Sequence, residues 1–156
     1  MRQEAKEKKK KRAIIKKTAG IKKTVRKNTS KQKSAPHLQS VEVKMRDKVL
    51  AALEAAKAEH IVIADVRGQS SLTDFLIIAS GRSSRQVKAL AEHTLYALKE
   101  CGVRNPRIEG TENSDWAVVD GGDVIVHLFR PEVRAYYRLE EIWGLEPPLQ
   151  ETFKRL

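Results

Sequence analysis

The chain has little of what secreted or membrane-spanning proteins depend on. Its 156 residues include one cysteine, Cys101, and no apolar run close to the roughly 20 residues that a membrane span requires. A single cysteine excludes an internal disulfide and makes a thiolate metal cage implausible, so the composition suits a reducing compartment. The N-terminus also lacks the apolar segment of a secretory signal. These absences predict a cytoplasmic protein with no membrane partner.

Positive charge is concentrated at the N-terminus. Residues 1–40 hold fifteen Lys and Arg against two Glu, a net of +13, whereas residues 41–156 hold sixteen against eighteen, a net of −2. The basic segment buries too little apolar surface to offset its ordering entropy, so we expect a disordered, Lys-rich tail over residues 1–40. Because it contains no Phe, Trp or Tyr, it would contact RNA phosphates without reading sequence. An organellar transit peptide fits less well, since such segments favour Arg and Ser and contain few acidic residues.

Hydrophobic periodicity predicts a single compact α/β domain over residues 41–146 and a loose tail over residues 147–156. Apolar residues at helical spacing mark three helices, and β-branched runs mark the strands. The predicted helices cover residues 43–59, 84–101 and 131–143, and the predicted strands cover residues 61–66, 75–79, 107–109, 116–120 and 123–129. The first strand is predicted to be buried, and the last, apolar on both sides, to be central. The result is a mixed sheet of about five strands with three helices.

Two local patterns refine this fold. Ser83 and Gln86 form a capping box, in which the Ser83 side chain accepts a bond from an unpaired backbone amide and the Gln86 side chain reaches back. A Gly-Gly pair at residues 121–122 separates two β-rich runs and predicts a tight hairpin, because a primed turn needs positive φ. With that pair as the loop, the facing residues on one side of the sheet are Val118 with Ile125 and Trp116 with His127.

The start of the second helix is a candidate anion site. Backbone amides at a helix N-terminus can hold a phosphate, and here Arg82 and Arg85 flank them. However, the sequence has neither the spaced glycines of a dinucleotide site nor a P-loop. The capping box explains Ser83 without a ligand, so ordinary capping is the preferred interpretation.

Acidic and histidine side chains offer further candidates. Asp115, Asp120 and Asp123 form a close carboxylate group, but Asp is common beside turns for its local hydrogen bonds. His127 could act as a general base, yet no nucleophile or orienting acid lies at a recognisable spacing. A His127 ring stacked beside Trp116 on the sheet is simpler. We therefore expect no catalytic residue, cofactor or metal.

The remaining chemistry is aromatic. Trp116, Tyr136, Tyr137 and Trp143 lie in the second half of the domain. Trp143 has the helical spacing of a core residue. Trp116 and Tyr137 fall near the ends of their elements, where a large ring with a polar group often anchors a protein interface, and both are expected to stand clear of the core.

Several motifs, in order along the chain, resemble a known family. They are Asp-Phe-Leu-Ile-Ile-Ala-Ser-Gly at residues 74–81, Glu109-Gly110, Asp115-Trp116, Asp-Gly-Gly-Asp-Val-Ile-Val-His at residues 120–127, and Arg-Ala-Tyr-Tyr-Arg-Leu-Glu at residues 134–140 before Trp143. On these motifs, residues 41–146 are similar to the ribosomal silencing factors, also called the Iojap family. The resemblance does not cover the basic tail.

The resemblance implies a fold, a partner and a contact surface. The fold is nucleotidyltransferase-like without the metal-binding carboxylates of that superfamily. The partner is the large ribosomal subunit, bound through a ribosomal protein at the face where the small subunit joins. The implied partner-binding residues are Trp116 and Tyr137, with Tyr136 as a weaker candidate, and we add the neighbouring His127.

We therefore expect a translation repressor that is not an enzyme and that sterically blocks subunit joining under nutrient limitation. The basic tail would add non-specific contacts to ribosomal RNA, and the exposed aromatic surface could pair with a second copy of the chain when no ribosome is available. Two alternatives stay open. One is a nucleotidyltransferase-like enzyme using Arg82, Ser83 and Asp120 or Asp123; the other is a general RNA-binding module that acts through the tail.

Overall fold

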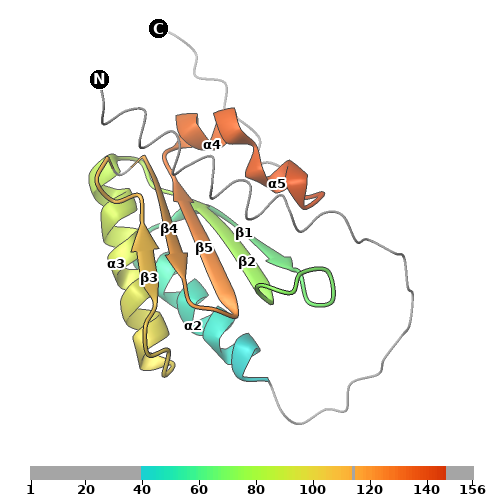
Figure 1. Cartoon of the computed structure of the whole chain (residues 1–156). Helices are drawn as coiled ribbons and strands as arrows, with labels where there is room; N and C mark the ends of the chain where they lie inside the picture. The colour runs from blue at the N-terminus through green and yellow to red at the C-terminus, as the bar shows by residue number, and fades with distance from the viewer. Residues whose placement is uncertain (1–39, 114, 147–156) are drawn as a thin grey trace, which may run out of the picture.

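A computed structural model describes residues 40–113 and 115–146 of the chain (Figure 1). The predicted basic tail at residues 1–40 lies, apart from Ser40, outside the described residues, and so does the predicted loose tail at residues 147–156.

The described residues form a single α/β domain. In chain order its elements are α2 (Val41–Ala55), β1 (Glu59–Asp65), β2 (Phe75–Ser80), α3 (Ser84–Glu100), β3 (Arg107–Glu109), β4 (Trp116–Asp120), β5 (Val124–Phe129), α4 (Pro131–Tyr137) and α5 (Leu139–Ile142). This order and the mixed five-stranded sheet confirm the predicted α/β class.

The sheet has the strand order β1-β2-β5-β4-β3. Only the central pair, β2 and β5, is parallel; the other neighbours run antiparallel. The prediction that the last strand is central is confirmed. The prediction that the first strand is buried is wrong, because β1 forms an edge and most of its residues are half-exposed. Its pairing with β2 is also irregular near His60, whose φ of 49° is left-handed.

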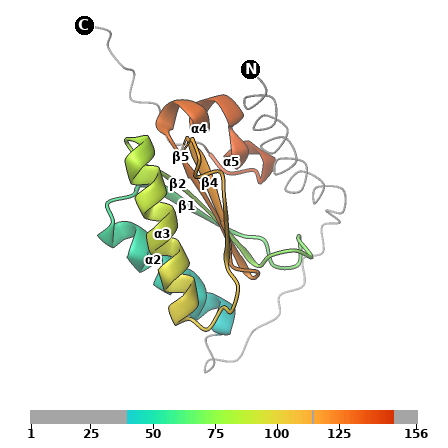
Figure 2. The same ribbon diagram turned by 60° about the vertical axis from the view of Figure 1, so that its left-hand side comes forward.

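Helices cover the two faces of the sheet unequally (Figure 2). We call the side packed against α2 and α3 the first face, and the side packed against α4 and α5 the second face. The first face holds the larger core, which includes Val49 and Leu53 of α2 and Leu90 of α3. These side chains recur at helical spacing, as the sequence predicted, and burying them favours the fold by roughly 1.5–3 kcal/mol each.

The start of α3 confirms half of the predicted capping box. The Ser83 Oγ accepts a hydrogen bond of 3.1 Å from the Gln86 backbone N–H. The Gln86 side chain does not return to Ser83. Its Oε1 accepts from the Arg82 N–H at 2.8 Å, and its Nε2 donates to the Lys57 carbonyl at 2.9 Å. Gln86 therefore connects the start of α3 to the turn that follows α2.

The β4–β5 hairpin has a longer loop than predicted. Trp116 pairs with Phe129 and Val118 with His127, a shift of two residues from the predicted register. The Asp120 side chain accepts from the Gly122 N–H at 2.9 Å, and this local bond widens the turn. Because side chains alternate with a period of two, the shift preserves which residues share a face. The second face still carries the predicted apolar side chains of both strands.

The final helix is broken, contrary to the prediction of one helix over residues 131–143. Arg138 adopts the left-handed conformation, with φ 46° and ψ 49°, and separates α4 from α5. The break brings Glu140 back onto Arg134, with which it forms a buried ion pair. Six residues on a continuous helix advance about 600°, which would turn these two side chains about 120° apart.

Candidate functional site

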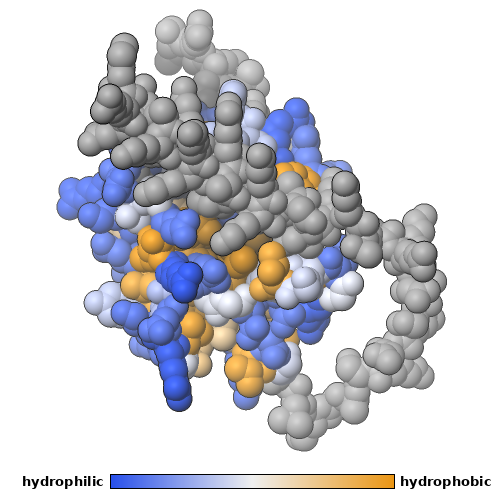
Figure 3. Space-filling view, viewed as in Figure 1, coloured by the Kyte–Doolittle hydropathy of each residue, from blue (hydrophilic) through white to orange (hydrophobic). Residues whose placement is uncertain are grey.

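The second face is the less completely covered side of the sheet. Its buried core includes Leu76, Ile78, Trp116 and Phe129, but a fringe of apolar residues around that core is only partly buried. This fringe consists of Val118, Ile125, Val133, Tyr137, Ile142, Trp143 and Leu145. Figure 3, in the orientation of Figure 1, shows apolar side chains gathered in the middle of the molecule on this side. Partly exposed apolar surface of this kind is typical of protein interfaces.

Four aromatic rings lead from this core to the surface, and we call them the aromatic ladder: Phe129, Trp116, Tyr137 and Tyr136. Their ring centroids are separated by 4.8 Å from Phe129 to Trp116, 4.9 Å from Trp116 to Tyr137, and 5.1 Å from Tyr137 to Tyr136. The last pair is edge-to-face, at 87°. Exposure rises along the ladder, from 0% at Phe129 and 2% at Trp116 to 80% at Tyr136.

This geometry corrects the expectation that Trp116 stands clear of the core. Its ring is buried because β4 pairs with β5, placing it on Phe129, while α4 folds Tyr137 over it. Gly110 lies close to the backbone of β4: it has a φ of 85°, and a Cβ there would lie 2.2 Å from the Trp116 carbonyl oxygen. Tyr137 is half-buried, so Tyr136, the weaker candidate from the sequence, is the ring most available to a partner.

His127 is a core residue and cannot touch a partner directly. It is fully buried, and its Nδ1 accepts a hydrogen bond of 3.2 Å from the Trp116 Nε1. Burial lowers the pKa of His127 to about 3, so the ring is neutral near pH 7. The prediction of a His ring beside Trp116 is confirmed, and the ring serves as the acceptor for the indole N–H.

A buried polar network beneath the same corner was not predicted from the sequence. The Arg134 Nε donates to the Glu140 Oε1, and the Arg134 Nη1 donates at 2.8 Å to both the Ser80 Oγ and the His60 carbonyl. Arg134 and Glu140 are almost fully buried. Both belong to the motif at residues 134–140, but no residue pattern marked them as partners, because their pairing depends on the break at Arg138.

The proposed carboxylate and anion sites are occupied by local interactions. Asp120 holds the hairpin turn, and Asp115 accepts from the Ser84 Oγ at 3.2 Å. Burial and the nearby carboxylates of Asp74 and Glu42 raise the pKa of Asp123. Among residues 40–113 and 115–146, no group of three His, Cys, Asp or Glu could hold a metal ion.

Two residues of the candidate phosphate site, Arg82 and Ser83, have partners within the domain. Arg82 forms an ion pair with Glu59, and Ser83 caps α3.

Cys101 is half-buried, and burial raises the pKa of its thiol, as expected for a packing residue. Within the described segments, no helix is long and apolar enough to cross a membrane.

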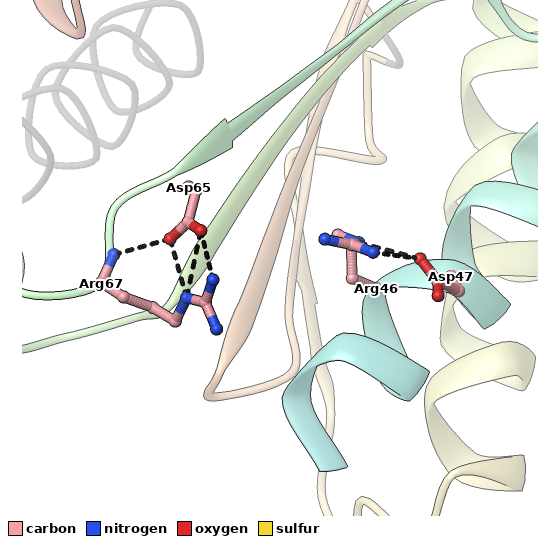
Figure 4. A network of polar contacts seen from close by, with 4 residues as sticks. All are labelled: Arg46, Asp47, Asp65 and Arg67. Atoms are coloured by element: carbon pink, nitrogen blue, oxygen red, sulfur yellow. Dashed lines mark hydrogen bonds and ion pairs between the residues drawn. The ribbon is translucent and has the colours of Figure 1, made fainter. Parts of the chain in front are cut away.

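Charged side chains also cap the hairpin end of the sheet (Figure 4). The guanidinium carbons of Arg46 and Arg67 lie 5.0 Å and 4.9 Å from the Phe75 ring centroid. Each guanidinium has a carboxylate partner, Asp47 for Arg46 and Asp65 for Arg67. Arg67 lowers the pKa of the Asp65 carboxyl by hydrogen bonding to it. Because these charges are paired within the domain, the cluster is better suited to covering the buried Phe75 ring than to holding a ligand.

Comparison with known proteins gives a consistent result. A family model described as "Ribosomal silencing factor during starvation" matches residues 37–155. The ribosomal silencing factor RsfS of Zymomonas mobilis is 46% identical over 92 residues, covering 59% of this chain and 69% of the relative. A mouse protein named "Mitochondrial assembly of ribosomal large subunit protein 1" is 32% identical over 102 residues, covering 64% of this chain and 45% of that protein.

Solved structures share the same architecture. A crystal structure from Chromobacterium violaceum superposes with a TM-score of 0.65 at 42% identity, covering 67% of this chain and 88% of that one. A second crystal structure, from Bacillus halodurans, has a TM-score of 0.58 at 37% identity, covering 64% and 93%.

Proposed function

The chain belongs to the ribosomal silencing factor family, and from this premise we propose that it represses translation by binding the large ribosomal subunit and sterically blocking the small subunit from joining. Family membership supports the coarser role, a regulator of translation that acts at the ribosome. The name of the mouse relative, which refers to assembly of the large subunit, favours that subunit as the partner. Such repression in the cytoplasm would reduce the amount of protein synthesis when nutrients are limiting.

The observation that carries this proposal is the exposed end of the aromatic ladder beside a partly open apolar face. Tyr136 is 80% exposed, yet its ring is held against Tyr137, which in turn packs on Trp116. A large ring held in place loses little conformational entropy on binding, which is the property of an interface anchor. We propose that this corner of the second face contacts a large-subunit ribosomal protein at the subunit-joining face. When no ribosome is present, the same face would pair with a second copy of the chain.

The proposed contact residues are accordingly Tyr136 and Tyr137, supported from beneath by Trp116 and His127. Truncating buried Trp116 would cost about 3–5 kcal/mol of folding free energy, so loss of binding in Trp116→Ala would not identify a contact. The Tyr136 side chain lacks that role in the core, which makes it the informative position.

We expect Tyr136→Ala to keep the parent melting temperature and to weaken large-subunit binding by about thirtyfold, the effect of losing about 2 kcal/mol at an anchor. The measurement is sedimentation of the purified protein with separated small and large subunits, followed by a test of subunit joining. Tyr96→Ala is the matched control, because Tyr96 is also an exposed tyrosine but lies on α3, on the opposite layer. Co-sedimentation with the small subunit, or unimpaired joining in the presence of bound protein, would contradict the proposed function.

A further inference from the structure

The corner between α4 and α5 is joined to the sheet by one buried guanidinium. The Arg134 side chain leaves α4 and reaches Glu140 of α5, Ser80 at the end of β2, and the His60 carbonyl in β1. A single side chain thus connects four elements. Arg suits this arrangement because its planar guanidinium presents donors in several fixed directions at once.

The buried Arg134–Glu140 ion pair contributes little net stability to the contact between the two helices. Desolvating two charges offsets most of their attraction, and an apolar pair of similar volume is often as stable. A hydrophobic contact, however, lets a short helix rotate about its axis, whereas the bonds of Arg134 to Ser80 and His60 fix that rotation. The physical gain from the network is therefore orientation rather than stability.

The orientation in question is that of the exposed rings. Tyr136 and Tyr137 are the last two residues of α4, a helix of only seven residues, and Arg134 lies less than one turn before them. A rotation of α4 would carry both rings with it and would move the Tyr137 ring away from its packing position on Trp116 of β4. The left-handed Arg138 follows directly and turns the chain so that Glu140 can reach Arg134.

We propose that Arg134 and Glu140 are positioning residues for docking: their buried pair sets the rotation of α4 and so the direction in which Tyr136 and Tyr137 meet the partner. This inference rests on the proposed function, since it concerns the same docking corner. It assigns a binding role to two residues that no partner can reach directly.

The test is a double-mutant cycle. One arm is Arg134→Met with Glu140→Leu, which removes both charges and keeps the volume, and the other is Tyr136→Ala. We expect the Met/Leu variant to melt within a few degrees of the parent but to bind large subunits about tenfold more weakly. In the Tyr136→Ala background the same two substitutions should cause a clearly smaller further loss, because one of the two rings that they position is gone.

A purely structural role would give a different result, in which the losses of the two arms add. The exposed pair Lys48 and Glu100, on the opposite layer, supplies the control: Lys48→Met with Glu100→Leu should leave binding unchanged. If the buried Met/Leu variant fails to fold, Ser80→Ala replaces it in the cycle. That substitution keeps the ion pair and removes one bond to the sheet, and we expect a loss of about threefold that becomes smaller in the Tyr136→Ala background.

Additive losses, or full affinity in a folded Met/Leu variant, would overturn the positioning role while leaving the docking corner in place. Unchanged binding of Tyr136→Ala in the parent would instead overturn the docking corner, and the positioning role with it. The two proposals therefore fail in distinguishable ways.

Discussion

The ionisation of His127 links acidity to the stability of the docking corner. The ring is fully buried and accepts the indole N–H of Trp116 through a nitrogen that has no proton of its own. Protonating Nδ1 would destroy that acceptor and place a charge in the core. The cost is reflected in a pKa lowered by burial from 6.5 to about 3.

The direction of the pH effect follows from this lowered pKa. The unfolded chain takes up the proton near pH 6.5 and the folded chain resists it until about pH 3. The contribution of His127 to stability is therefore complete above pH 6.5 and is lost progressively as the pH falls below it. We expect this residue alone to lower the free energy of unfolding by about 2 kcal/mol between pH 7 and pH 5.

Comparing the parent with His127→Gln isolates this contribution, because Gln can still accept a hydrogen bond but does not titrate. Urea unfolding at pH 7, 6 and 5 should show the stability of the parent falling more steeply than that of the variant. Parallel pH profiles for the two proteins would show that His127 is not buried in neutral form.

Among the elements, α3 is the best defined by local sequence, and its start depends on one hydroxyl. Ser83 accepts from the Gln86 N–H, and the first turn contains no acidic side chain that could substitute for it. We expect Ser83→Ala to destabilise the fold by about 1 kcal/mol, the usual cost of losing an N-cap. Chemical denaturation measures this, with the exposed loop residue Ser71 as the control for a Ser→Ala change. Equal effects at the two positions would mean that the cap contributes nothing.

Helices and strands were predicted correctly where their apolar residues follow a regular spacing. The predictions failed where a few individual side-chain contacts determine the local structure. The helical spacing of Met45, Val49 and Leu53 was sufficient to predict α2. The hairpin register was not predictable from the glycines alone, because the Asp120 side chain bonds to the turn and widens it. Nor was the break at Arg138, because the apolar spacing continues through it and only the buried partner of Glu140 requires it.

At the candidate site, too, the exposure of individual residues depends on tertiary contacts that the sequence pattern does not reveal. Three of the four aromatic residues that the sequence singled out, Trp116, Tyr137 and Tyr136, do meet in one ladder. The expectation that Trp116 stands clear of the core was wrong, because residue type alone does not distinguish the covered ring from the exposed one. Which ring is covered depends on how α4 folds back onto the second face. Tertiary packing, not residue type, decides which ring faces solvent.

At the scale of the whole molecule, charge divides the chain into two parts. Residues 1–40 carry a net of +13, whereas residues 41–156 carry a net of −2. Docking of the domain through apolar and aromatic contacts should depend little on salt, and phosphate contacts by Lys and Arg should depend on it strongly. Salt can therefore separate the contributions of the two parts to ribosome binding.

Removing residues 1–39, which keeps Ser40 before α2, should weaken binding at low salt and make the remaining binding more salt-resistant. Every Lys or Arg that no longer neutralises a phosphate should reduce the slope of log K against log salt by about 0.7–0.9, so even three such residues would change it by roughly two to three. The truncated chain should still select the large subunit and still respond to Tyr136→Ala.

Replacing the four lysines Lys8, Lys9, Lys10 and Lys11 with Arg preserves the charge and should preserve the slope, whereas Gln at those positions should not. If truncation abolished all binding, the basic segment would be the principal ribosome-binding element, as the alternative of a general RNA-binding module requires.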